Sequence, residues 1–490
     1  MHVLIWFLFF LYGAMLLFIF LYSSVQFYLA LKHYFKKSND QVPELTSFPK
    51  VTVQLPIYNE KYVVERLIRA VAKLDYPTDQ LEIQVLDDST DETIDLINDI
   101  VQQFRNEGNN IVVVRRENRT GFKAGALAHG LTRCEGKFVA IFDADFIPKS
   151  DFLLKTLPYF QDKNIGLVQT RWEHINKNYN WLTQLQAFGL DAHFSVEQDG
   201  RNSQGHFINF NGTAGVWRKE TIEDAGGWQS DTLTEDLDLS YRAQLKGWKF
   251  KYLKDQGTPA ELPAAMNALK TQQYRWTKGG AECAVKNLPP VLRQKELPWS
   301  TKVHASFHLL NTLVFVCILL TGVLSLPMLL IKGNFEQYDF IFEVASIFTI
   351  SLFFLAFFYW VSSRDQAGSK PLSFIQYLIR FPFFMSVYMG LSLHNAIAVL
   401  EGYLGRKTSF VRTPKFNLVE EGDSWKGNKY LRKNVNPLTY WEILLSGYFI
   451  VSIAIGFQYN DLGLLPFHLM LGGGFLMVAV FSFRHRSGRV

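Results

Sequence analysis

The sequence has few cysteines and few charged residues, and both shortages narrow the class of protein. Three cysteines occur in 490 residues, Cys134, Cys283 and Cys317, too few and too widely spaced for a disulfide framework or a zinc site. Charged residues make up 19% of the chain and hydrophobic residues 48%. This composition excludes a disordered chain and is unusual for a soluble enzyme. A net charge of +5 is too small to predict a nucleic-acid partner.

Several long stretches contain no charged residue at all. Residues 1–31 have no Asp, Glu, Lys or Arg, and such a run exceeds the ~20 residues that cross a bilayer as a helix. Similar uncharged runs cover 303–331, 344–363, 381–400, 443–460 and 462–483. The chain therefore divides into an N-terminal membrane anchor (1–37), a polar domain (38–302), two membrane helices (303–363), an interfacial helix with a loop (364–440), and two membrane helices with a tail (441–490).

Basic residues next to these runs predict the orientation of the chain, because they mark the cytoplasmic side of a membrane. Lys32, Lys36 and Lys37 follow the first run, so the N-terminus is expected outside and the polar domain in the cytoplasm. The tail is also expected in the cytoplasm, since it contains Arg484, Arg486 and Arg489.

The run 381–400 does not fit that orientation as a simple span. If it crossed the membrane, the strongly basic stretch 405–433 would lie outside. An interfacial or re-entrant helix removes the conflict, so the sequence favours five spans, with six as the alternative. No charged residue lies inside the five favoured runs, which argues against a transporter.

The polar domain alternates between strand and helix patterns. Apolar or alternating segments at 51–55, 81–86, 111–114 and 138–142 read as strands, and 61–74 and 91–104 have helical spacing. This order predicts a doubly wound α/β domain with a mainly parallel sheet. No G-x-G-x-x-G motif follows the first strand, which excludes the dinucleotide-binding type.

Carboxylates follow two of these strands. Asp87 and Asp88 end the second strand, and Asp143 and Asp145 end the fourth. Parallel strands end at the same sheet edge, where ligands bind, and paired carboxylates there suit Mg²⁺ or Mn²⁺ shared with a diphosphate. A simple turn is the alternative for either pair alone. Two pairs at neighbouring strand ends favour the metal.

Two further motifs contain polar side chains that secondary structure alone does not explain. Glu235, Asp236 and Asp238 stand at the start of a helical run over 237–245, and helix capping explains one of these carboxylates. The motif Gln272-Gln273-Tyr274-Arg275-Trp276 suits either a membrane-interface anchor or a phosphate clamp with an aromatic platform for a sugar.

In this order the motifs resemble those of the processive glycosyltransferases of family 2, which include cellulose, chitin and hyaluronan synthases. The chain is most similar to plant cellulose synthase-like mannan synthases and xyloglucan-backbone glucan synthases, and to bacterial cellulose synthase catalytic subunits. The matching stretches include QLPIYNE (54–60), QVLDDSTDET (84–93), VQTRWEHIN (168–176), NFNGTAGVWR (209–218) and LTEDLDLSYRAQLKGWKF (233–250). The resemblance covers most of residues 50–285 and implies the nucleotide-sugar transferase fold of glycosyltransferase A type.

The resemblance also implies roles for individual residues. It makes Asp236 the catalytic base, and Asp143 and Asp145 the ligands of Mg²⁺ or Mn²⁺. The donor nucleotide would be bound by Asp87, Asp88, Lys123 and Asp143. The acceptor and diphosphate would lie against Asn211, Gly212, Thr213, Glu235, Gln272, Arg275 and Trp276. Phe410, Arg412, Thr413 and Lys415 resemble the gating loop of bacterial cellulose synthases, with Arg412 in place of a valine. A plain basic cytoplasmic loop is the alternative for this segment.

The function implied is inverting transfer of a hexose from GDP-mannose or UDP-glucose to a growing β-1,4-linked polysaccharide, with export of the product. The expected partners are the nucleotide sugar, a glycan acceptor, membrane lipids and an accessory export subunit, and the expected location is the cell inner or plasma membrane. One alternative is transfer of a single sugar to a lipid. Another is a membrane scaffold or transporter that only binds nucleotide.

Overall fold

The fold is described from a computed structural model. It describes residues 2–36, 43–365, 372–408, 411–418, 423, 425, 428–430 and 436–485. Phe410 of the gating-like loop therefore lies outside the described residues, as do Lys37, Arg486 and Arg489 of the orientation argument.

A seven-stranded sheet forms the centre of the polar domain, in the order β3-β2-β1-β4-β6-β5-β7. The strands are β1 (Val51–Ile57), β2 (Leu81–Asp87), β3 (Ile111–Val114), β4 (Phe138–Ile141), β5 (Ile165–His174), β6 (Gly215–Arg218) and β7 (Lys249–Ala260). β1 pairs in parallel with β2 and β4, whereas β6 runs antiparallel to both β4 and β5. All four predicted strands are present, and the mainly parallel α/β sheet is confirmed.

Helices cover both faces of this sheet, because alternate strand residues point to opposite sides. On one face Val51, Val53 and Leu55 pack in a core shared with α2 (Val64–Ala72), α3 (Thr93–Asn106) and α5 (Phe152–Thr156). On the other face Val139 and Ile141 pack with α4 (Phe122–Leu131), α8 (Lys219–Asp224) and α9 (Glu235–Leu245). Because β1 runs parallel to β2 and β4, the loops after these three strands lie at the same edge of the sheet.

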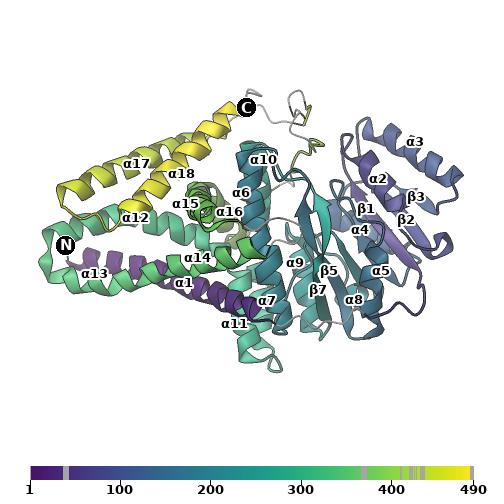
Figure 1. The fold of residues 1–490 in the computed structure, drawn as a ribbon, viewed down its shortest axis with the longest axis horizontal. Helices are drawn as coiled ribbons and strands as arrows, with labels where there is room; N and C mark the ends of the chain where they lie inside the picture. Colours follow the sequence, from purple (N-terminus) through teal and green to yellow (C-terminus); the bar gives the residue numbers. More distant parts are fainter. Residues whose placement is uncertain are drawn as a thin grey trace.

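Long apolar helices lie on the other side of the molecule (Figure 1). In the part of the chain that the structure describes, five are long and apolar enough to cross a membrane: α1 (His2–Tyr34), α12 (Leu313–Asn334), the stretch Glu336–Arg364 that ends in α14 (Ile350–Arg364), α17 (Leu438–Gln458) and α18 (Leu465–Arg484). A sixth is reached only if the pair α15 (Phe374–Gly390) and α16 (Ser392–Tyr403) counts as one span. The protein is therefore a membrane protein.

Three details of the membrane region differ from the sequence-based expectation. The uncharged run 303–331 is not one helix, because α11 (Trp299–Leu309) ends before α12 begins. The run 381–400 is divided between α15 and α16, which meet at an angle of 50°. Several candidate helices extend past the uncharged runs and so contain charged residues, among them Lys332 in α12, Glu343 in the stretch Glu336–Arg364 and Glu442 in α17.

Charged contacts join the two sides of the molecule. His33 near the end of α1 lies 2.8 Å from a carboxylate oxygen of Asp199 and 2.6 Å from one of Asp365. The ammonium of Lys270 lies 2.7 Å from the Glu442 carboxylate of α17, and both side chains are buried. Lys270 belongs to α10 (Met266–Arg293), a long helix between the sheet and the membrane helices (Figure 1). All three cysteine side chains are buried.

Candidate active site

The polar side chains singled out from the sequence meet in one cleft at the open edge of the sheet. Two adjoining hollows share Lys123, Asp143, Asp145, Arg275 and Lys415 in their walls. The first hollow is also lined by Asn211, Gly212, Glu235, Asp236, Gln272 and Trp276. The second is also lined by Tyr58, Glu60, Asp88, Arg119, Arg412 and Thr413. Residues as far apart in the sequence as Tyr58 and Lys415 thus form one polar surface.

Lys123 in the first turn of α4 links three parts of the cleft. Its ammonium lies 2.6 Å from an Asp143 carboxylate oxygen and 3.9 Å from one of Glu235, and it donates to the backbone carbonyl of Gly212 at 2.8 Å. Burial favours the neutral amine, but the carboxylates of Asp143 and Glu235 outweigh it and raise the pKa of Lys123. Lys123 is therefore held as a cation where a diphosphate could approach.

Asp236 lies in the first turn of α9, beside the same lysine. Its Oδ1 accepts the backbone N–H of Leu237 at 2.9 Å. Burial and the negative charge of Glu235 raise the pKa of Asp236 to about 7, while Lys123 and Arg275 oppose the rise. A carboxylate with a pKa near neutrality is matched to general-base work.

Gly212 leaves room for the side chains of Asp236 and Lys123, which both lie against it. Its φ of +79° belongs to the left-handed region that glycine adopts without strain. A Cβ at this position would stand 2.9 Å from Asp236 Oδ2 and 3.4 Å from Lys123 Nζ. The neighbouring Thr213 supports the same loop, since its Oγ1 accepts the Asp143 backbone N–H at 2.9 Å.

The segment 411–418 closes one side of the cleft through three carboxylates of the sheet domain. Lys415 Nζ lies 2.6 Å from Asp145 Oδ2, and Arg412 lies 2.6 Å from Glu60. Glu261 accepts the backbone N–H groups of Phe416 and Asn417 at 2.8 and 2.9 Å. Burial raises the pKa of Glu60 to about 7 against the opposing charge of Arg412.

The other side of the cleft is aromatic. Gln272, Arg275 and Trp276 lie on α10 and line the first hollow. Trp276 faces Trp172 of β5, with ring centroids 6.4 Å apart, and Trp172 also packs on Phe146 at 5.1 Å. Flat aromatic surfaces beside polar groups suit the faces of sugar rings.

Most predicted site residues that the structure describes line this cleft, but Thr213 and Asp87 do not. Asp88 lines it, but the Asp87 carboxylate is turned to Arg115 Nε at 2.8 Å and to the Ser89 backbone N–H at 3.0 Å. Asp87 therefore braces the strand end behind Asp88.

Sequence reasoning missed four residues that take part. Glu60 pairs with Arg412, and Glu261 accepts hydrogen bonds from the segment 411–418. Trp172 and His174 line the wall of the cleft. Glu60, Trp172 and His174 lie inside stretches that carry the family resemblance. Glu261 follows β7 and had no motif to mark it.

The donor set fits a hard divalent cation that shares a diphosphate. Asp143 and Asp145 offer carboxylate oxygens in the same cleft, and Mg²⁺ is typically held by one or two carboxylates plus substrate phosphates. Among the described residues no three His, Cys, Asp or Glu side chains are grouped to hold a metal by themselves. A cation here would therefore depend on phosphate oxygens, and both carboxylates already face an ammonium group.

Known proteins similar to this chain agree with the motifs. Residues 49–279 match the family model described as "Glycosyltransferase like family 2". Glucomannan 4-beta-mannosyltransferase 1 of Oryza sativa subsp. japonica is 42% identical over 305 residues, which cover 59% of this chain and 58% of that protein. Glucomannan 4-beta-mannosyltransferase 2 of Arabidopsis thaliana is 38% identical over 401 residues, covering 78% of this chain and 70% of that protein. The chain thus spans little more than half of some of these relatives.

A solved structure confirms the fold. The mannosyltransferase from Pyrobaculum calidifontis, determined in complex with GDP-Man and Mn²⁺, superposes with a TM-score of 0.58. The match covers 82% of this chain and all of that one, at 19% sequence identity. With the identity to the plant enzymes, this confirms the resemblance expected from the motif order: the chain belongs to glycosyltransferase family 2, the family of the glucomannan 4-beta-mannosyltransferases.

Proposed function

We propose that the protein is a membrane-embedded inverting glycosyltransferase that extends a β-1,4-linked polysaccharide with mannose from GDP-mannose, or with glucose from UDP-glucose. The observation that carries the proposal is the cleft itself. It brings a half-buried carboxylate with a raised pKa, Asp236, next to a fixed cation, Lys123, and the aromatic wall at Trp276. The relatives named as glucomannan mannosyltransferases favour mannose.

The reaction is a single displacement at the anomeric carbon. Asp236 takes the proton from the acceptor hydroxyl as that oxygen bonds to the carbon, and the bond from the carbon to the diphosphate oxygen breaks. The nucleoside diphosphate leaves with the bonding electrons, and inversion turns an α-linked donor into a β-glycoside. One general base suffices, unlike the two carboxylates of a retaining hydrolase.

The cations of the cleft stabilise the leaving group. Lys123 and Arg275 border both hollows, so negative charge that develops on the diphosphate meets positive charge already in place. Bound by Asp143 and Asp145, a Mg²⁺ or Mn²⁺ ion would add Lewis-acid stabilisation of the same charge. Lys415 pairs with Asp145 and would have to release that carboxylate for it to hold the ion, so the segment 411–418 would cover or uncover the donor site.

The charges next to the membrane helices indicate how the protein is oriented in the membrane. The basic residues after the first helix favour a cytoplasmic catalytic domain, with the N-terminus outside and the C-terminus inside. Five spans and a bent, interfacial α15–α16 pair agree with that orientation. The product would leave across the membrane beside these helices, with the help of an accessory subunit.

Purified protein in detergent tests the proposal. It is incubated with Mn²⁺ or Mg²⁺ and either GDP-mannose or UDP-glucose, and both the released nucleoside diphosphate and the product size are measured. Release from one donor, with a long product that a β-1,4-glycan hydrolase degrades, is the expected result and identifies the sugar. A product of one sugar on a lipid contradicts the polymerase. Nucleotide binding without release in membranes that retain native lipids and partners contradicts transferase activity.

A further inference from the structure

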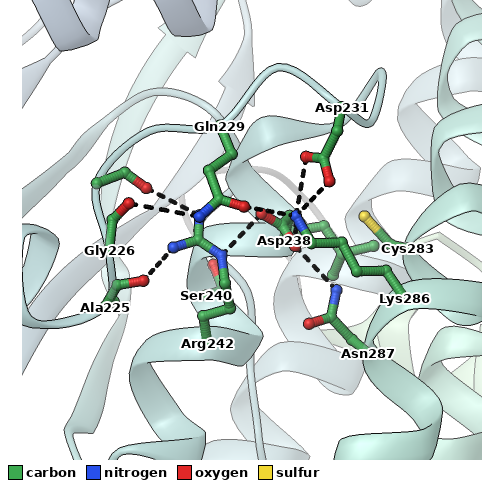
Figure 2. Close-up of polar contacts among 12 residues, drawn as sticks. Ala225, Gly226, Gln229, Asp231, Asp238, Ser240, Arg242, Cys283, Lys286 and Asn287 are labelled. Atoms are coloured by element: carbon green, nitrogen blue, oxygen red, sulfur yellow. Dashed lines mark hydrogen bonds and ion pairs between the residues drawn. The ribbon is translucent and has the colours of Figure 1, made fainter.

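A polar network lies behind the cleft, where α9 meets the C-terminal half of α10 (Figure 2). At its centre is Asp238, whose side chain is 0% exposed. Its carboxylate accepts from Arg242 Nε at 2.8 Å and Asn287 Nδ2 at 3.1 Å, and lies 3.0 Å from Lys286 Nζ. A buried carboxylate is costly without such partners, and these three side chains supply them.

Lys286 links the side chain of Asp238 to the loop that leads into α9. Besides Asp238, its ammonium donates to Gln229 Oε1 and to Asp231 Oδ1, both at 2.8 Å. An ammonium group has three N–H donors, and three side chains, Gln229, Asp231 and Asp238, offer acceptor oxygens to them (Figure 2). The guanidinium of Arg242 extends the network by donating to the backbone carbonyls of Ala225 and, at 2.9 Å, Gly227.

The network ends at the catalytic turn. Asp238 is two residues after Asp236 on α9, and its backbone N–H donates to the Thr234 carbonyl at 3.2 Å, which closes the first turn. The loop before that turn is fixed to α10 as well, because Glu282 accepts the Leu233 backbone N–H at 2.7 Å. Rotation of the turn that bears Asp236 would break these contacts together.

The helix that contacts Asp238, α10, also carries the residues expected to lie against the acceptor and the diphosphate. Gln272, Arg275 and Trp276 lie in the N-terminal half of α10, and Lys286 and Asn287 in its C-terminal half. The base and the diphosphate side of the cleft are therefore positioned by one helix, through contacts remote from the reacting atoms.

We propose that Asp238 and Lys286, its cationic partner on α10, are positioning residues that hold the Asp236 turn of α9 in register with Arg275 and Trp276 on α10. This inference rests on the proposed function for its effect on catalysis. Its structural part, an ordered first turn of α9, is independent of any activity.

The test uses the full-length protein and three variants. Lys286→Gln removes the charge, Lys286→Arg keeps it, and Lys246→Gln is the control. Lys246 is also next to α9 and pairs with Asp224, but at 3.8 Å and with a side chain that is 58% exposed. A misplaced catalytic group costs catalysis rather than ground-state binding. We expect Lys286→Gln to lower kcat about tenfold or more with little change in donor KM, and Lys286→Arg to restore at least half of the loss.

Amide hydrogen exchange over residues 234–241 gives the second readout, since local opening of the turn speeds exchange. Faster exchange in Lys286→Gln but not in Lys246→Gln supports the proposal, even if no donor is turned over. Unchanged exchange together with unchanged kcat overturns it. A loss of kcat that Lys286→Arg does not restore, with exchange raised across the whole sheet domain, also overturns it, because that pattern reports general destabilisation. Inactivity of the wild type contradicts the proposed function and leaves the exchange result to decide the positioning role.

Discussion

The charges next to Asp236 decide when it can act as a base. Burial and Glu235 favour its protonated form, whereas Lys123 and Arg275 favour the carboxylate. The balance leaves a pKa of about 7, so a large fraction of the molecules holds the base in its active form at neutral pH. Glu235 thus adjusts the working pH of its neighbour.

Replacing the base tests its role directly. Asp236→Asn keeps the shape of the side chain but cannot take a proton, so kcat should fall by at least ~10²-fold, the usual size of a general-base contribution. Donor binding should be nearly unchanged, as measured by the Kd for the nucleoside diphosphate. Asp224→Asn, outside the cleft, is the matched control and should keep wild-type kcat. Equal losses of kcat and of nucleotide affinity would argue that Asp236 binds the donor.

The pH profile tests the electrostatics. Because the base must be deprotonated, kcat/KM should rise with pH through about 7, the pKa of Asp236. Glu235→Gln removes a negative neighbour and so stabilises the carboxylate, which should move this rise to lower pH by about one unit, as expected for loss of a nearby like charge. A rise that stays in place, or moves to higher pH, would show that another group controls it.

At the scale of elements, the segment 411–418 competes for the cleft that it covers. Lys415 holds Asp145, one of the two carboxylates that suit a divalent cation, at 2.6 Å. Glu261 meanwhile fixes the backbone of Phe416 and Asn417 to the end of β7. Lys415 can therefore leave Asp145 while Phe416 and Asn417 stay bonded to Glu261.

Metal affinity should report this competition. Lys415→Met frees Asp145, and loss of a competing ion pair worth about 1 kcal/mol corresponds to about fivefold tighter binding. Calorimetric titration with Mn²⁺ in the presence of the nucleoside diphosphate measures the change in Mn²⁺ affinity. Lys407→Met removes a basic residue from the same loop region outside segment 411–418 and should leave the affinity as in the wild type. Weaker Mn²⁺ binding in Lys415→Met would contradict the competition.

Elements with a simple repeating pattern were predictable, and irregular ones were not. β1 to β4 follow from runs of apolar or alternating residues, and the parallel order of three of them brings Asp88, Asp143 and Asp145 to one edge. Nothing local marks β6, which runs antiparallel because it returns along β4 after a long excursion. The pairing of Glu60 with Arg412 joins residues about 350 positions apart and depends on tertiary structure alone.

At the scale of the whole molecule, one buried ion pair couples the catalytic domain to the membrane helices. Lys270 on α10 and Glu442 on α17 lie 2.7 Å apart and are 4% and 0% exposed. This contact could not be predicted from the sequence, because Glu442 lies just before the uncharged run 443–460. Either charge left alone in that environment would be strongly destabilising.

Thermal unfolding in detergent tests the coupling. Lys270→Met leaves Glu442 buried without a cation and should reduce the free energy of unfolding by about 3–5 kcal/mol. Adding Glu442→Met should recover most of the loss, because an apolar pair of similar volume commonly replaces a buried ion pair at little cost. Lys332→Met, which breaks a more exposed pair with Asp461, should change the midpoint far less. A double variant as unstable as the single one would show that Lys270 acts through other contacts.

The burial of every cysteine in the chain has a practical consequence. Cys134, Cys283 and Cys317 are all enclosed, and burial raises the pKa of the Cys134 and Cys283 thiols, so few thiolates form and reagents reach them slowly. A single cysteine introduced on an exposed loop would then react far faster than the native three. Membrane-impermeant maleimides can therefore map which loops face each side of a vesicle without first building a cysteine-free background.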